Sequence, residues 1–472
     1  MERAYAAELN DGNLSAIFAG CEDFIRRELW HDGQCAYAYA LDGMVAGGFM
    51  SDYVLKPIAE GLLHGSPQER FRQALGGAVY NAVAVEVKDL KAAAELLVNG
   101  FCVVWFPGGG AVGFEIRSPT RRAPSPPEVE STVKGAKDAF TETIRINTAL
   151  VRRHLRSPFL RLAGMTVGRR SLTHVTVCSL DGLTDPALVA RVKERVASID
   201  VDGFLSPAAV EEYLTGSRET AFPLLQYTER TDRFAQALLD GRVGVLVDGL
   251  PLGYILPVDV GYLMRSPEDR GVDFLSASAQ RLLRYAALLV TLLLPGLYIA
   301  MSTFQPEMLP TPLLRAIIES KKDVPFGTAV EVIALLLAFE ILQQAGLHLP
   351  RAIGQSVSII GGLVVGSAAV EASLVSPAAL IVAAAAGICG FVLPTRDFSD
   401  AIRLWRLLLA VSAACAGLFG LTAGVIALVI RLAALSSLGR PYLAGAKLTR
   451  PLLVCEKFRD PALHPQDLRR QR

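Results

Sequence analysis

The residues best placed for chemistry are acidic side chains inside apolar stretches. Glu331 and Glu340 lie in the apolar segment 326–346, and Glu371 lies between two long uncharged runs. A carboxylate that faces lipid is costly, so such residues normally face a bundle interior or a water-filled path. Rings of carboxylates select cations where identical subunits surround a pore. These three glutamates are therefore candidate pore or gating residues, and a hydrogen-bonded structural role is the alternative interpretation.

A second group of candidate residues is charged and lies in the polar part of the chain. Two arginines end a predicted amphipathic helix (Ala136–Arg156), where positive charge complements the helix dipole. Their alternative role is a salt-bridge network with the acids of a polar loop, since loops of this chemistry often carry interactions. The residues that we predict to form an inter-subunit or inter-subdomain contact are Arg152, Arg153, Thr228, Glu229, Arg230 and Asp232.

The rest of the sequence shows no catalytic constellation. The run Gly108-Gly109-Gly110 lacks the lysine and serine of a phosphate-binding loop. The histidines do not have zinc-ligand spacing, and the cysteines have neither metal nor redox spacing. The net charge of +1 gives no reason to expect a nucleic acid partner. We therefore predict no catalytic residues, no metal site and no cofactor, so that an enzyme is the least supported class.

Long uncharged runs predict membrane-crossing helices in the last part of the chain. They cover residues 285–303, 352–370, 372–395 and 407–430. A helix of about 20 apolar residues crosses the hydrocarbon core of a bilayer, so each run is long enough. In segment 326–346 the two acids point to opposite sides of a helix, at about 100° per residue. We predict that this segment is re-entrant, interfacial or sandwiched between other helices.

The first 280 residues alternate β-like and helix-like stretches and contain an internal repeat. The sequence Ala40-Leu41-Asp42-Gly43-Met44 recurs as Ser179-Leu180-Asp181-Gly182-Leu183, and the stretch that begins at Asn99-Gly100 recurs at Asp240-Gly241. The offsets are 139 and 141 residues. Two echoes at nearly one offset predict tandem α/β subdomains.

The predicted fold is thus an α/β soluble N-terminal module of two similar subdomains, followed by an all-α multi-spanning transmembrane domain. The predicted parts are a first subdomain (1–118), a Pro-rich linker (119–127), a second subdomain (128–280), a transmembrane domain of about four spans plus the Glu-containing helix (281–435) and a basic C-terminal tail (436–472). Arg281, Arg284 and the basic tail predict that both ends of the chain are cytoplasmic.

Several ordered motifs resemble those of a known family. In the polar part they are Arg122, Pro127, Glu130, Lys134 to Thr143, Asn147, Thr148, Leu150, Arg152 and Arg153, then Phe222-Pro223, Gln226 to Asp232, Gly241-Arg242-Val243, Val247-Asp248-Gly249 and Pro251. In the apolar part they include Arg281, Arg284, Pro295, Tyr298, Pro306-Glu307-Met308, Glu331, Glu340 and Gly439-Arg440-Pro441-Tyr442. Together they resemble the GerA family, the A subunits of spore germination receptors.

The resemblance implies a multi-pass protein of the spore inner membrane that works with a transporter-like B-type subunit and a C-type lipoprotein. Such complexes respond to nutrients, and the response begins with ion release followed by release of dipicolinic acid. The resemblance further implies that the A subunit is a homo-oligomeric ion-conducting element in contact with membrane lipid. The A-like protein of the dipicolinate-release operon shares these motifs. A non-conducting scaffold and a secondary transporter remain as alternative functions.

Overall fold

The computed structural model describes residues 5, 7–118, 127, 130, 134–203, 206–216, 220–348 and 368–443. The chain divides into two compact units: Met1–Arg218 with Leu225–Pro257, and Glu219–Leu224 with Val258–Arg472. Most of the predicted linker, most of the predicted span 352–370 and residues 444–472 of the tail lie outside the described residues.

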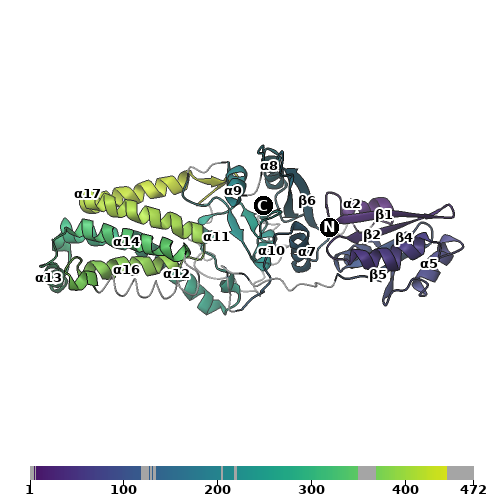
Figure 1. Ribbon diagram of the computed structural model, residues 1–472, viewed down its shortest axis with the longest axis horizontal. Helices are drawn as coiled ribbons and strands as arrows, with labels where there is room; N and C mark the ends of the chain where they lie inside the picture. Colours follow the sequence, from purple (N-terminus) through teal and green to yellow (C-terminus); the bar gives the residue numbers. More distant parts are fainter. Residues whose placement is uncertain are drawn as a thin grey trace. The chain divides into compact units, whose positions relative to one another are not determined.

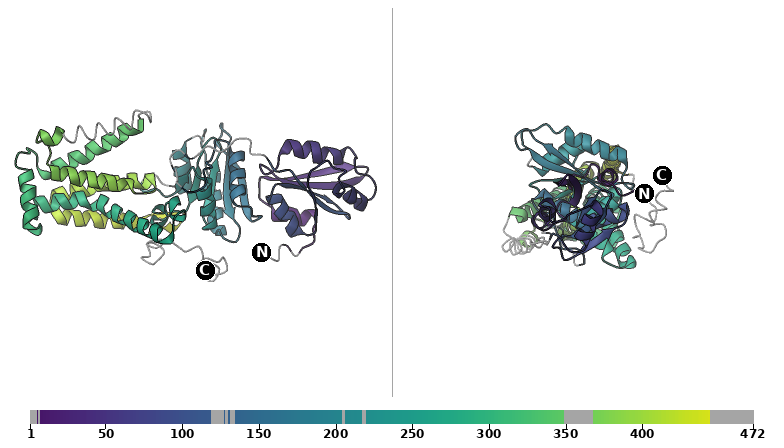
Figure 2. Two further views of the ribbon diagram at one scale, coloured as in Figure 1. Left: turned by 90° about the horizontal axis from the view of Figure 1, so that it is seen from below. Right: turned by 90° about the vertical axis from the view of Figure 1, so that its right-hand side faces the viewer.

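The first unit begins with a five-stranded antiparallel sheet in the order β1-β2-β4-β5-β3. Its strands are β1 (Phe24–His31), β2 (Gln34–Leu41), β3 (Ala84–Val87), β4 (Phe101–Phe106) and β5 (Gly110–Glu115). Its helices are α2 (Asp11–Ile17), α3 (Gly47–Met50), the π-helical turn η1 (Ser51–Leu55), α4 (Lys56–Ala59), α5 (Pro67–Leu75) and α6 (Leu90–Val98). Helices cover both faces of this sheet (Figure 2).

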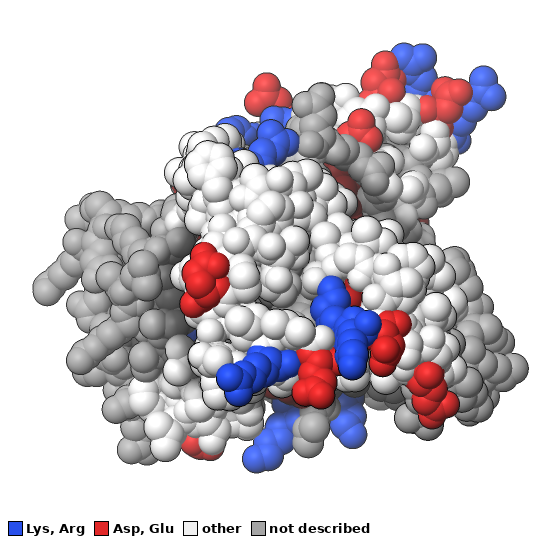
Figure 3. Space-filling view, turned by 90° about the vertical axis from the view of Figure 1, so that its left-hand side faces the viewer, with Lys and Arg blue, Asp and Glu red and all other residues white. Residues whose placement is uncertain are grey.

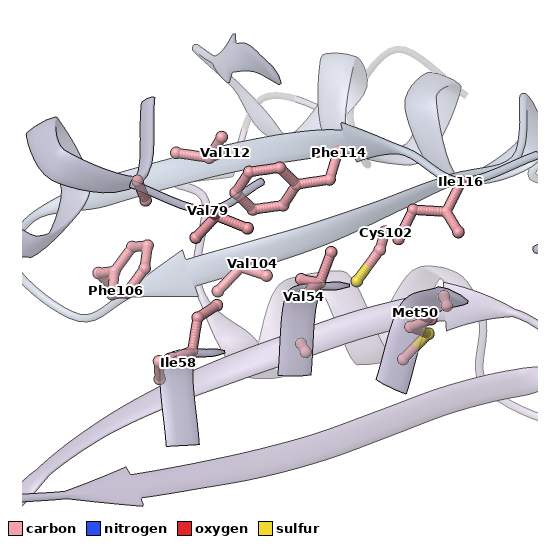
Figure 4. Packing of buried hydrophobic residues seen from close by; sticks show 14 of the residues in the cluster. Met50, Val54, Ile58, Val79, Cys102, Val104, Phe106, Val112, Phe114 and Ile116 are labelled. Atoms are coloured by element: carbon pink, nitrogen blue, oxygen red, sulfur yellow. The ribbon is translucent and has the colours of Figure 1, made fainter. Parts of the chain in front are cut away.

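The apolar pattern explains this layering. Met50, Val54 and Ile58 recur every four residues, so they share one face of the continuous α3–η1–α4 helix. This face packs on the strand residues Cys102 and Val104 in one buried cluster (Figure 4). Strand β4 is buried along nearly its whole length because helices lie on both sides of it.

A second five-stranded antiparallel sheet follows, in the order β6-β7-β9-β10-β8. Its strands are β6 (Leu160–Val167), β7 (Thr173–Leu180), β8 (Gln226–Thr228), β9 (Val243–Val247) and β10 (Gly253–Leu256), and its helices are α7 (Ile144–His154), α8 (Pro186–Ala197), α9 (Pro207–Thr215) and α10 (Thr231–Leu239).

The two sheets repeat one plan, because each strand of the first has a counterpart at the same place in the second. The turn glycines also correspond: Gly43 and Gly182 have φ of 77° and 82°, and Gly100 and Gly241 have φ of 84° and 79°. These left-handed conformations favour glycine, which explains why the repeated motifs retain it. The predicted fold class of two similar subdomains followed by a helical membrane domain is confirmed.

The predicted helix Ala136–Arg156 begins only at Ile144. The backbone N–H of Ile144 donates to Asp248 Oδ1 at 2.9 Å, and that of Thr141 donates to Asn147 Oδ1 at 2.8 Å. These side chains satisfy N–H groups at and just before the helix start, which have no partner within the helix. The preceding residues are extended, with Ala139 bridged to Arg230, so the helix prediction was eight residues too long at this end.

The second unit is a helical bundle (Figure 1). Its elements are α11 (Val260–Leu263), η2 (Pro267–Arg270), α12 (Phe274–Thr303), η3 (Pro306–Met308), α13 (Thr311–Ser320), α14 (Thr328–His348), α16 (Pro377–Phe391), α17 (Arg396–Ala434), β11 (Ser436–Ser437) and β12 (Arg440–Pro441). Helix α14 is uninterrupted and contacts α12, α16 and α17, so it lies among other helices.

Within the described residues, three helices are long and apolar enough to cross a membrane: Phe274–Thr303, Thr328–Ala345 and Arg396–Ala434. The apolar helix Pro377–Phe391 is shorter. The end of the bundle that carries α13 shows a mostly uncharged surface with a few acidic and basic side chains (Figure 3). Such a surface suits helices that are surrounded by lipid and end near a polar boundary.

Helix α17 reverses direction in its middle. Ala416 and Gly417 are non-helical, and Gly417 has φ 59° and ψ −140°, a conformation open mainly to glycine. A Cβ on Gly420 would lie 2.0 Å from the Ser412 carbonyl oxygen, and one on Gly424 would lie 2.7 Å from Leu409. Residues on opposite sides of the break therefore touch, and the two arms, 396–415 and 418–434, run side by side (Figure 1). The single span predicted over 407–430 is thus broken by this turn.

Candidate functional site

Arg152 of α7 joins the two subdomains. Its side chain is fully buried, and its Nε and Nη2 donate to the Asp23 carboxylate at 2.7 and 2.9 Å. Nη1 donates to the Ser157 carbonyl at 3.3 Å. Burial alone lowers the pKa of the Arg152 guanidinium, but the hydrogen bonds and charge of Asp23 raise it overall. We call this ion pair the clasp; the sequence had offered acids of the polar loop as the alternative partners of Arg152.

Further opposite charges surround the clasp. The first subdomain presents acids and the second presents bases: Arg145 Nη2 lies 2.5 Å from Asp42 Oδ1, and His174 pairs with Glu22. The backbone N–H of Glu22 also donates to the Leu162 carbonyl at 2.9 Å. The subdomain contact is therefore electrostatically complementary as well as covalently tethered. The repeated motif at Asp42 was visible in the sequence, but its pairing with Arg145 was not.

The predicted loop residues form a separate cluster beside strand β8. Arg230 is buried and donates to both Asp232 oxygens, at 3.0 and 2.6 Å, and to the Glu130 carbonyl at 3.3 Å. The Thr228 hydroxyl donates to the Glu130 carboxylate, and Arg233 Nη1 lies 2.6 Å from the same group. The structure thus brings the predicted residues Thr228, Arg230 and Asp232 together with Glu130 and Arg233. Through Glu130, this cluster binds the chain that follows the linker to strand β8.

The remaining predicted contact residues have different surroundings. The Glu229 carbonyl accepts the Phe140 N–H at 2.8 Å. This backbone hydrogen bond continues the pairing of the second sheet just beyond β8. Arg153 is exposed and forms no ion pair with the described residues. Sequence reasoning therefore grouped residues that the structure assigns to the clasp, to the β8 cluster and to the surface.

A partly buried acid beside the β8 cluster, Asp138, went unnoticed in the sequence. Asp138 Oδ2 lies 2.7 Å from His154 Nε2, which also lies 2.9 Å from the Thr231 hydroxyl. Burial alone raises the pKa of the Asp138 carboxyl, but hydrogen bonds from His154 and Thr231 outweigh burial and lower this pKa to about 2. The three groups connect α7 with the start of α10.

Glu331 lies in the first turn of α14 and is buried. Its Oε1 accepts the backbone N–H of Ser376, the N-cap of α16, and its Oε2 lies 3.6 Å from Lys321 Nζ. A carboxylate at a helix N-terminus is favoured by the unpaired N–H groups and the helix dipole. Glu331 therefore fixes the start of α16 against α14.

Glu340 faces two arginines of the first arm of α17. Its Oε1 lies 3.2 Å from Arg403 Nη1, and its Oε2 lies 3.8 Å from Arg406 Nη2. Arg403 also bonds to Gln343, one turn further along α14, and to Asp400. The Arg406 side chain is fully buried, and none of its three guanidinium nitrogens has a hydrogen-bond partner in the described part of the chain. We call this group the membrane charge cluster.

Glu371 differs from both other acids. It is exposed and makes no ion pair within the ranges that the structure describes. The three candidate pore residues thus have separate neighbours: Glu331 caps a helix, Glu340 belongs to the charge cluster, and Glu371 is unpaired among the described residues.

A buried acid also receives the two arginines at the entry of α12. Asp269 Oδ1 lies 2.6 Å from Arg284 Nη2, and Asp269 Oδ2 lies 3.1 Å from Arg281 Nη2. The two arginines had been interpreted as orientation signals, and their partner lies in a short 3-10 turn without sequence periodicity. Across the described residues, no group of three or more His, Cys, Asp and Glu could hold a metal ion.

Comparison with known proteins identifies the chain. The family model described as "Bacillus/Clostridium GerA spore germination protein" matches residues 12–452. The chain belongs to the GerA family. The clasp, the β8 cluster and the membrane charge cluster all lie within the matched residues.

Several curated GerA-type relatives are similar over most of their length. The chain is 34% identical to "Uncharacterized membrane protein YfkQ" of Bacillus subtilis over 92% of this chain and 84% of the relative. It is 31% identical to "Spore germination protein B1" of the same organism over 85% of this chain and 83% of the relative. For "Spore germination protein A1" the identity is 33% over 75% and 74%.

A solved structure is also similar to part of this GerA chain. It is the crystal structure of the N-terminal domain of the A subunit of the Bacillus megaterium spore germinant receptor GerK3, with 24% identity and a TM-score of 0.41. The match covers 53% of this chain and 96% of that one.

Proposed function

We propose that this chain is the A-type membrane subunit of a nutrient-responsive spore germination receptor, and that copies of it assemble into an ion-conducting element. The observation that carries the proposal is the family match over residues 12–452, which includes both the soluble module and the apolar helices. Ion release through this element precedes release of dipicolinic acid. The receptor lies in the spore inner membrane, with the N-terminal module in the cytoplasm, and includes a B-type transporter-like subunit and a C-type lipoprotein.

Among the three acids of the bundle, Glu371 is the best candidate for contact with passing cations. Glu331 and Glu340 are engaged with other helices of the same chain, whereas Glu371 is exposed and unpaired among the described residues. A carboxylate that repeats around an oligomer attracts cations when it faces a water-filled path. The proposal therefore assigns Glu371 to the ion path, and Glu340 to its regulation.

The test measures potassium efflux from liposomes that contain the purified full-length chain. We expect Glu371→Gln to lower efflux severalfold at equal protein content, because the path loses a charge that attracts cations. Glu319→Gln is the matched control, since Glu319 is an exposed acid of α13 outside the charge cluster. If Glu331→Gln, Glu340→Gln and Glu371→Gln all conduct like the wild type, the assignment of these acids to conduction fails.

A second candidate function is a non-conducting membrane scaffold for germination proteins. It is favoured by the internal pairing of Glu331 and Glu340, since paired carboxylates of this kind also serve purely to hold helices together. The same liposomes separate the two functions: efflux from protein-containing liposomes equal to that from empty ones supports the scaffold. Under that outcome the chain still binds the B-type and C-type subunits, which co-purification measures.

A further inference from the structure

A short segment between two elements of the soluble module belongs to the second compact unit, the helical bundle, which we call the membrane unit. Residues 220–224, which we call the strap, connect α9 to β8 in sequence, yet they group with the helical bundle. Phe222 is 2% exposed, and its ring centroid lies 6.2 Å from that of Phe398 and 6.4 Å from that of Trp405, both on α17. The ring of Tyr442 lies at 6.2 Å. A segment that connects two elements of the soluble module therefore buries an aromatic side chain in the membrane unit.

Hydrogen bonds between backbone groups and side-chain hydroxyls hold the strap in this place. The Phe222 N–H donates to the Thr220 hydroxyl at 3.1 Å, which makes a local turn. The Ser437 hydroxyl donates to the Leu224 carbonyl at 2.6 Å and accepts the Val258 N–H at 3.2 Å. Burial of the Phe222 side chain removes a large apolar surface from water, so the aromatic contact is the main interaction that holds the strap.

The helix that receives Phe222 also carries the membrane charge cluster, on a different side. Phe398 and Trp405 are seven residues apart and share one face of α17. Arg403 follows Phe398 by five residues, which places it about 140° around the helix from the aromatic face. The first arm of α17 therefore contacts the strap with one side and Glu340 with the other.

The contact between Arg406 and Glu340 is incomplete, because no hydrogen bond joins the two groups. Arg406 is fully buried without a hydrogen-bond partner among the described residues, and its nearest carboxylate oxygen lies at 3.8 Å. Buried charges that lack good partners favour rearrangement, because either hydration or a closer pairing lowers their free energy. A small shift of the α17 arm therefore has a large electrostatic consequence at Glu340.

We propose that Phe222 is a positioning residue: it seats the first arm of α17 and thereby holds Arg403 and Arg406 against Glu340. The strap is covalently continuous with α9 and β8 of the soluble module, so a movement of that module withdraws Phe222, shifts the arm and releases Glu340. This inference rests on the proposed function and adds the regulation of ion flux to it. Phe222 acts through α17, the helix that it contacts.

The first test is a double-mutant cycle on the full-length chain in detergent. Phe222→Ala, Glu340→Gln and the double variant are compared in a Trp30→Phe/Trp105→Phe background, where Trp405 reports the melting of the bundle. Changes at independent, distant sites add. We expect the double variant to melt at nearly the temperature of Phe222→Ala alone. Additive shifts overturn the proposal whether or not the chain conducts ions.

The second test measures potassium efflux from liposomes without nutrient. We expect Phe222→Ala to raise basal efflux severalfold and Phe222→Leu to raise it less, since leucine keeps part of the apolar contact. Phe49→Ala is the matched control, because Phe49 is a half-exposed phenylalanine of the first subdomain. If Phe222→Ala and Phe49→Ala leave efflux equally unchanged while the wild type conducts, the positioning role is wrong. A wild type that does not conduct defeats the proposed function, and the melting cycle then still decides the positioning role.

Discussion

Two arginines of this chain are equally buried and differently satisfied. Arg152 in the soluble module and Arg406 in the membrane unit both have side chains with 0% exposure. Arg152 makes two short bonds to Asp23 and one to a carbonyl group. Arg406 has only a 3.8 Å approach to Glu340, and its three nitrogens have no hydrogen-bond partner among the described residues.

The difference separates a well-satisfied ion pair from a poorly satisfied one. Removal of a guanidinium from water costs several kcal/mol, and only close, multiple hydrogen bonds offset this cost. The clasp has them and fixes one subdomain against the other. Arg406 lacks them, so its own charge contributes little to stability and is suited to exchange partners when α17 moves.

The largest effect is expected from Asp23→Ala, which leaves Arg152 buried and unpaired. We expect a loss of about 3 to 5 kcal/mol in the free energy of unfolding of the soluble module. The measurement is guanidinium unfolding of the full-length chain in detergent in a Trp405→Phe background, where Trp30 and Trp105 of the first subdomain report.

Asp42→Ala is the matched control for this prediction. Asp42 also pairs across the subdomain contact, but its partner Arg145 is 65% exposed. Exposed ion pairs contribute about 0 to 1 kcal/mol, so the control is expected to unfold nearly like the wild type. Equal losses in the two variants would contradict the distinction between the clasp and its surroundings. The double change Arg152→Met/Asp23→Leu is expected to recover part of the stability, because it removes both charges.

Arg152 was a candidate contact residue from the sequence, whereas its partner Asp23 was not, and the reason is physical. Periodicity and spacing describe neighbours within an element, and they predicted the duplicated subdomains because the same turns recur at one offset. Asp23, Glu130 and Asp269 meet their arginines across the fold, where spacing carries no information.

The reversal of α17 was hidden for a different reason. Apolar length predicts that a segment lies in lipid, but it does not predict where the backbone turns. Gly417 adopts a conformation that glycine alone tolerates well, within a run of uncharged residues that otherwise suits one helix. The contacts of the strap were equally hidden, because Phe222 lies in a short connection whose partners, Phe398 and Trp405, are far away in sequence.

The next largest effect is expected from Arg406→Met, and it is a gain in stability where Asp23→Ala gives a loss. Methionine fills a similar apolar volume without an unsatisfied charge, so we expect the membrane unit to gain up to about 4 kcal/mol. Trp405 emission during unfolding, in the Trp30→Phe/Trp105→Phe background, measures the change. Arg403→Met is the control: this residue has partners in Glu340, Gln343 and Asp400, so its loss is expected to destabilise. A destabilising Arg406→Met would show that the charge cluster is as well satisfied as the clasp.

The smallest effect on folding is expected at Arg153, directly beside the clasp residue. Arg153 is exposed and has no ion pair with the described residues, so Arg153→Ala is expected to change the free energy of unfolding by less than about 0.5 kcal/mol. Its predicted role is contact with another subunit, and light scattering of the detergent-solubilised chain measures that role as a shift from oligomer to monomer. Arg153→Lys keeps the charge and is expected to keep the assembly. If Arg153→Ala leaves both stability and oligomer size unchanged, Arg153 is a surface residue, and of the two adjacent arginines only Arg152 retains a role.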